Sequence, residues 1–173
     1  MTFLIASIYY LDEEHYDIKG KNYQLFLEKC FLYSEYFSLI SPRERQDEKK
    51  YSYISDDLSD YVLIQKNTFA WPGNIILKPY DNKYNQAVTY SIYKCCNDTR
   101  RILEEASPSL FSWCDGRPED LTFYYSNKKI FLYSVAHEAT CRISCAPVIF
   151  KEFVELNLWT VESEDKFIEE IYF

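Results

Sequence analysis

Apolar residues recur in the N-terminal part of the chain with two different periods. Residues 3–11 carry β-branched and aromatic side chains up to an acidic turn, which predicts a strand. Apolar positions then recur at intervals of four, three and four, which predicts a helix over residues 23–34. These positions are Phe26, Cys30, Tyr33 and Phe37. A strand over residues 36–40 is expected next, and a single strand over 31–40 is an alternative because that segment also fits a period of two.

The following part of the chain alternates polar connections with short apolar runs. Residues 42–50 contain four bases, three acids and no large apolar residue, which is typical of a solvated connection or an exposed helix end. Strands are predicted at residues 61–64 and, after the turn 71–74, at residues 75–77. Residues 51–66 return to apolar content, with Asp56, Asp57 and Asp60 clustered before the run at 61–64.

A strand and a helix are predicted in the middle of the chain. Residues 87–95 are rich in β-branched and aromatic side chains, several of which alternate with Thr and Ser. Asn97 or Asp98 can then cap a helix that runs to Ala106, because either side chain accepts hydrogen bonds from the first free backbone amides.

Three β-type runs separated by short polar turns predict an antiparallel meander near the C-terminus. The runs are residues 121–125, 130–135 and 139–145. In the third run the odd-numbered residues from Ala139 to Cys145 are apolar and those between them are polar, which indicates one buried and one solvated face. A helix is expected to begin at Pro147 and to continue through Phe153 and Leu156, with a second short helical stretch after Ser163.

Length and composition limit the number of domains. The chain has 173 residues and a mass of 20.8 kDa, the size of one ordinary domain. Hydrophobic residues make up 47% of it, which is enough to build a core. The sequence predicts a single α+β domain over residues 1–173, mainly an antiparallel sheet with a C-terminal β-meander and helices packed on one side.

Composition also excludes several classes of function. Only three glycines are present, which excludes the phosphate-binding P-loop and the dinucleotide fingerprint. Acidic residues outnumber basic ones by 27 to 19, for a net charge of -8. Because this charge repels polyanions, direct binding of nucleic acid or of an anionic membrane is not expected. A basic protein partner is the better hypothesis.

The sequence also bears on the compartment. The apolar N-terminal segment has no basic residue before it and no plausible cleavage site after it, so a strand is expected there rather than a signal peptide. No stretch approaches the roughly 18 uninterrupted apolar residues needed to cross a bilayer. The six cysteines are expected to be reduced thiols. These features predict a cytoplasmic protein.

Few residues offer catalytic or metal-binding chemistry. His137 with Glu138 is the candidate general base, but adjacent residues in a strand or tight turn point to different sides, so the two are not expected to pair. Cys141 and Cys145 share a strand face but lie roughly 13 Å apart along an extended chain, too far for one tetrahedral ion. We therefore expect no catalytic residue, no metal ion and no cofactor.

Acidic residues are concentrated in two places. Residues 151–173 contain seven acids and two bases, and a second cluster precedes the strand predicted at 61–64. We expect these acids to form a surface that steers and holds a basic partner, with an aromatic anchor beside it. The candidate partner-binding residues are Asp56, Asp57, Asp60, Trp159, Glu162, Glu164 and Asp165. The alternative for each is a solvated face that only keeps the protein soluble.

Two neighbouring segments carry a resemblance to a known family. Residues 117–124 (RPEDLTFY) and residues 130–138 (IFLYSVAHE) resemble a block in small acidic bacterial immunity proteins of polymorphic or contact-dependent toxin systems. The resemblance implies binding and neutralisation of a cognate toxin domain without chemistry. It assigns no binding residue.

Three functions are therefore open. The first is a cytoplasmic immunity protein that binds a cognate toxin domain, for example a basic nuclease, and occludes its active or substrate-binding surface. The second is a small hydrolase-type enzyme that uses His137 with a carboxylate such as Glu138 or Asp120. The third is a phage-encoded or regulatory inhibitor of another host protein.

Overall fold

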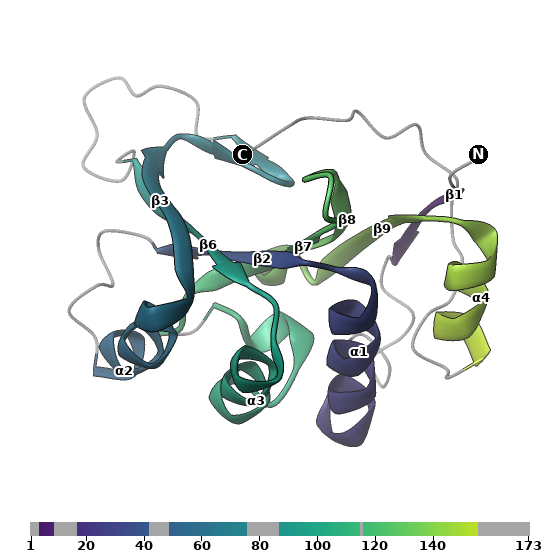
Figure 1. Cartoon of the computed structure of the whole chain (residues 1–173), viewed down its shortest axis with the longest axis horizontal. Coiled ribbons are helices and arrows are strands. Elements are labelled where there is room, and N and C mark those ends of the chain that lie inside the picture. The colour runs from purple at the N-terminus through teal and green to yellow at the C-terminus, as the bar shows by residue number, and fades with distance from the viewer. Residues whose placement is uncertain (1–3, 9–16, 42–48, 76–86, 115, 156–173) are drawn as a thin grey trace.

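The structure, a computed structural model, describes residues 4–8, 17–41, 49–75, 87–114 and 116–155 (Figure 1). In this part of the chain the main feature is a sheet of seven strands in which every neighbouring pair is antiparallel. The strands in spatial order are β1 (Leu4–Ile8), β9 (Thr140–Cys145), β8 (Ile130–Val135), β7 (Glu119–Tyr124), β2 (Tyr36–Ser41), β6 (Val88–Lys94) and β3 (Val62–Thr68). The fold class predicted from the sequence is confirmed.

The helices cover one face of this sheet. They are α1 (Gly20–Tyr33), α2 (Lys49–Leu58), α3 (Asn97–Ala106) and α4 (Pro147–Glu155). All four contribute side chains to one buried cluster with the strands, and α1, α2 and α3 lie side by side below the sheet in Figure 1. Each helix contributes at least one fully buried side chain to this cluster. These are Phe26 of α1, Leu58 of α2, Leu103 of α3 and Phe153 of α4. Each such side chain contributes about 1.5–3 kcal/mol by leaving water.

The opposite face of the sheet carries a smaller cluster under a short hairpin. The hairpin consists of β4 (Ala70–Trp71) and β5 (Asn74–Ile75), and Trp71 packs in the same cluster as Tyr133 and Val135 of β8. Gly73 turns the hairpin with a φ of +84°, and a Cβ added there would lie 2.6 Å from a methyl carbon of Val135. Glycine is therefore needed at this turn for both its backbone conformation and its size.

The C-terminal meander agrees closely with the sequence-based prediction. Strands β7, β8 and β9 are neighbours in the sheet and follow one another along the chain. In β9, Cys141, Ile143 and Cys145 are buried, and the residues between them are half-buried. Ala139 does not extend this strand, because it adopts a left-handed conformation with φ of +49° after the 3-10 helix Ala136–Glu138 (η4).

One helix was not predicted and one helix cap was wrong. Residues 49–58 form α2, and the last two residues of the run 42–50, which was predicted as a solvated connection or an exposed helix end, begin this helix. Ile54 and Leu58 lie four residues apart on α2 and both enter the buried cluster that the helices share with the sheet. The N-cap of α3 is Cys96, not Asn97 or Asp98. The Cys96 amide donates to the Thr99 side chain at 3.0 Å, which satisfies a backbone group at the start of the helix.

Candidate functional site

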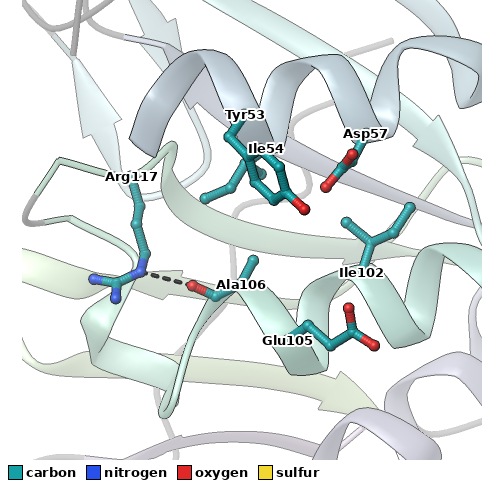
Figure 2. A pocket seen from close by; sticks show the side chains of 7 residues that line it. All are labelled: Tyr53, Ile54, Asp57, Ile102, Glu105, Ala106 and Arg117. Atoms are coloured by element: carbon teal, nitrogen blue, oxygen red, sulfur yellow. Dashed lines mark hydrogen bonds between the residues drawn. The ribbon is translucent and has the colours of Figure 1, made fainter. Parts of the chain in front are cut away.

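A groove lies between α2 and α3 on the helical side of the sheet. It holds a cavity of about 440 Å³, and Figure 2 shows the side chains that line it. The lining residues are Tyr53, Ile54 and Asp57 from α2, Ile102, Glu105 and Ala106 from α3, and Arg117 from the segment before β7. We call this feature the α2–α3 groove.

Helical spacing explains why these residues meet. Residues three and four apart on a helix point to the same side, so Ile54 and Asp57 of α2 face the groove together, as do Ile102 and Ala106 of α3. Ile54 is 5% exposed, and Ile102 packs against the buried cluster that the helices share with the sheet, so the two side chains form an apolar floor. Tyr53 stands at the edge of the groove with 69% of its surface exposed.

Arg117 is fixed at one end of the α2–α3 groove by backbone carbonyls. Its Nε donates to the Ala106 carbonyl at 2.8 Å and its Nη1 donates to the Ser112 carbonyl at 3.3 Å. The first of these carbonyls belongs to the last residue of α3, where a cation is also favoured by the helix dipole. The groove therefore has an ordered positive charge at this end.

Two carboxylates stand on the opposite walls of the groove. Figure 2 shows Asp57 on α2 and Glu105 on α3, both away from the end that holds Arg117. Both residues are exposed. Asp56 of α2 and Asp60 of the 3-10 helix Ser59–Tyr61 are exposed as well, but they do not line the groove. The groove thus combines an apolar floor with an acidic rim.

The predicted partner-binding residues fall into two groups. Asp56, Asp57 and Asp60 are exposed, and Asp57 lines the α2–α3 groove. The other four, Trp159, Glu162, Glu164 and Asp165, lie outside the described residues. Of the C-terminal acids that the structure describes, Glu152 accepts hydrogen bonds from Lys29 Nζ at 2.6 Å and Tyr33 Oη at 2.5 Å. Glu152 therefore ties α4 to α1.

His137 and Glu138 lie in the short 3-10 helix η4, where His137 Nε2 is 3.8 Å from Glu138 Oε1. This distance is too long for a hydrogen bond, so the two side chains do not form the hydrogen-bonded pair that a general base would use, in agreement with the expectation from the sequence. Their side chains are 54% and 60% exposed, and neither lines the α2–α3 groove.

Asp120 is a buried carboxylate whose two oxygens are both engaged. Oδ1 accepts from the Ala136 amide at 2.9 Å. Oδ2 accepts from Trp71 Nε1 at 2.7 Å and from Asn74 Nδ2 at 3.1 Å. Burial raises the pKa of Asp120, and these hydrogen bonds oppose that effect in part. The carboxylate joins the hairpin β4–β5 to β7 and η4, which is a structural role.

The cysteines are packing residues in the part of the chain that the structure describes. All six are free, and Cys30, Cys141 and Cys145 are buried. Burial raises the pKa of the Cys30 and Cys141 thiols and raises that of Cys145 to about 12, so these groups are poor nucleophiles at neutral pH. Among the described residues, no group of three or more His, Cys, Asp or Glu side chains is arranged to hold a metal ion.

Sequence reasoning missed most of the groove. It identified Asp57 but not Ile54, Ile102, Glu105 or Arg117, because it placed no helix at residues 49–58. The available signal was the spacing of Ile54 and Leu58, which is that of one helical face.

The described residues include no helix that is both long enough and apolar enough to pass through a membrane. Comparisons of the chain with protein-family models, with curated proteins and with solved structures give no significant match.

Proposed function

We propose that the protein is an immunity protein, which binds a cognate toxin domain in the cytoplasm and occludes its active or substrate-binding surface. The observation that carries the proposal is the α2–α3 groove, where an apolar floor is bordered by exposed carboxylates. The proposed partner is a protein with a basic surface, such as a nuclease domain. In this proposal the protein transforms no substrate.

Charge supports a basic partner. The net charge is -8, and Asp56, Asp57 and Asp60 place three carboxylates on one short stretch of the surface. Such a surface accelerates encounter with a positively charged protein and repels nucleic acid. A toxin that acts on nucleic acid carries the complementary charge on its substrate-binding face.

Exposed apolar and aromatic groups support a protein partner over a small ion. Tyr53 is 69% exposed beside the groove, and tyrosine is among the residues that contribute most to protein interfaces. Ile102 is half-buried and offers an apolar surface in the groove that a partner side chain can cover, and the buried Ile54 lies beside it. Burial of these groups would slow dissociation, while the surrounding carboxylates would speed association.

The enzyme alternative has weaker support. Its three candidate groups are close in the fold, since His137 Nε2 lies 3.8 Å from Glu138 Oε1 and both residues influence the pKa of Asp120. However, both oxygens of Asp120 already accept hydrogen bonds from the chain itself. The His137–Glu138 pair lies on an exposed 3-10 helix instead of in a cavity that excludes water.

The test is co-expression with the toxin domain encoded by the neighbouring gene, scored for rescue of growth and for a purified complex. We expect rescue by the wild-type chain. We expect D56N/D57N/D60N to associate with the toxin about tenfold more slowly at low salt. E28Q/E35Q/E155Q is the matched control, because it removes the same number of charges from exposed residues on α1, on the connection from α1 to β2, and on α4.

The other outcomes separate the alternatives. Absence of both rescue and complex would contradict the proposal. Rescue that is lost in H137Q while the complex still forms would favour the enzyme alternative, and a complex only with another host protein would favour the regulatory inhibitor. Charge reversal at Glu162, Glu164 and Asp165 tests the remaining part of the predicted acidic surface. Unchanged rescue and affinity at low salt would make those residues a solubilising face only.

A further inference from the structure

We propose that the α2–α3 groove is the docking site for an amphipathic segment of the toxin that carries an arginine. In the docked complex the guanidinium group of the partner's arginine binds near Asp57 and Glu105, and an apolar neighbour on the same segment contacts Ile102 above the buried Ile54. Figure 2 shows these four lining side chains. This inference rests on the proposed function and names the chemistry by which the partner is recognised.

The arrangement of charge in the groove selects a cation. Asp57 and Glu105 line the groove from different helices, so a cation bound in the groove is attracted by both negative charges. The apolar floor formed by Ile54 and Ile102 accommodates the methylene groups of a long basic side chain. A purely apolar ligand would leave the two carboxylates unpaired at the edge of the contact.

Arginine fits the groove better than lysine. Its planar guanidinium binds carboxylates through several donors and is less strongly hydrated than an ammonium group, so it enters a partly apolar site at lower cost. Tyr53 presents an exposed ring at the same rim, and guanidinium groups stack on aromatic faces.

The fixed position of Arg117 gives the groove a direction. Its guanidinium is held by the Ala106 and Ser112 carbonyls at one end, and the two carboxylates lie away from that end. A segment whose arginine approached Arg117 would meet a like charge. The docked segment therefore places its arginine near Asp57 and Glu105 and its neutral or acidic end near Arg117.

The size of the groove indicates a segment and not a single side chain. Its volume of about 440 Å³ lies within the range of roughly 300–1,000 Å³ that is usual for ligand pockets. Both walls are helical, and an amphipathic helix or a short extended segment can place two or three side chains into such a groove.

The cation preference can be tested without the toxin by methyl NMR. The probes are N-butylguanidinium chloride and, as the uncharged control of similar length, n-butanol. We expect saturable shifts of the Ile54 and Ile102 methyl signals with the guanidinium probe, with a dissociation constant in the millimolar range. The methyl signal of Ile143, which is buried in β9, serves as the internal control.

Two variants test separately the contributions of the carboxylates and of the open groove to binding of the probe. D57N/E105Q removes both carboxylates, and we expect it to weaken binding of the guanidinium probe about tenfold, which corresponds to about 1.4 kcal/mol. A106L keeps every charge but fills the groove, since Ala106 lines it, and we expect it to abolish the methyl shifts. E28Q/E155Q is the matched charge control, because both residues are exposed, on α1 and α4, and neither lines the groove.

Each outcome of the probe experiment decides the inference. Selective shifts that are lost in D57N/E105Q and A106L but kept in E28Q/E155Q support it. Equal binding of n-butanol, or binding unchanged in D57N/E105Q, would overturn it. Toxin neutralisation without any binding of the guanidinium probe would overturn the inference and leave the proposed function standing. Probe binding without toxin neutralisation would contradict the proposed function and would overturn the toxin as the occupant of the groove.

Discussion

Replacement of Asp120 by asparagine tests the structural role of the buried carboxylate. Asp120 is 1% exposed and has a φ of +56°, a conformation that asparagine also adopts readily. D120N therefore changes the hydrogen-bonding groups and the charge with little effect on the backbone. It isolates the contribution of the carboxylate from that of the turn.

The hydrogen bonds of Asp120 determine how much stability D120N is expected to lose. The asparagine oxygen can still accept from Trp71 Nε1 and Asn74 Nδ2, but its amide group would then face the Ala136 amide, donor against donor. One buried donor is left without an acceptor, which costs about 1–3 kcal/mol. We expect D120N to lower the free energy of unfolding by this amount at neutral pH.

The pH dependence of the difference in unfolding free energy between the wild type and D120N provides a second check. Burial raises the pKa of Asp120 above its ordinary value of 3.8, so the folded state holds the proton more tightly than the unfolded state between the two pKa values. The unfolding free energy of the wild type therefore falls as the pH rises through that window. The asparagine side chain of D120N takes up no proton, so the stability advantage of the wild type over D120N is largest at acid pH and declines to a plateau.

The assay is urea unfolding of both proteins at a series of pH values, followed by circular dichroism. Groups that titrate in both proteins change the two unfolding free energies equally, so their contributions cancel in the difference between wild type and D120N. Equal stability of D120N and wild type at neutral pH would refute the hydrogen-bonding argument. If the stability advantage of the wild type over D120N grew as the pH rises, the argument that burial raises the pKa of Asp120 would be refuted.

Two further predictions concern the packing of the hairpin and of α4. G73A should lower the free energy of unfolding by about 1–3 kcal/mol, because its Cβ would overlap Val135 and Tyr133. G20A is the control for positive φ alone, since no atom lies within 4 Å of its added Cβ, and a loss as large as that of G73A would contradict the argument. E152Q should unfold at lower temperature than the wild type at neutral pH, because Lys29 and Tyr33 lose a charged acceptor. These interactions lower the pKa of Glu152 below 4.5, so the wild-type advantage should disappear as the pH falls through that lowered value, and an advantage that persists in stronger acid would argue against the ion pair.

The strands were predictable because their pattern is local. In β9 each buried residue alternates with a more exposed one, and the turns around β8 are short and polar. A period of two over six residues leaves little choice of structure. The two faces of the sheet also explain why β8 shows no such alternation: all six of its residues are buried, between the helices and the hairpin β4–β5.

Helix α2 was not predictable in the same way. Its side chains that enter the core are Ile54 and Leu58, and Tyr53 beside them is largely exposed. Two apolar positions in a polar stretch do not distinguish a helix from a connection. The helix depends on tertiary contacts, because Leu58 joins the same buried cluster as Leu103 of α3.

The α2–α3 groove follows from that packing. Leu58 and Leu103 are both fully buried and hold the two helices against the sheet, which turns the neighbouring positions Ile54, Ile102 and Ala106 toward the space between them. Arg117 closes one end through carbonyl groups of the backbone, which no pattern of side chains reveals. The exposed acids could be recognised as a surface from sequence. The apolar floor that distinguishes a docking site from a solvated face required the structure, because its residues come from helices that are separated along the chain by β3 and β6.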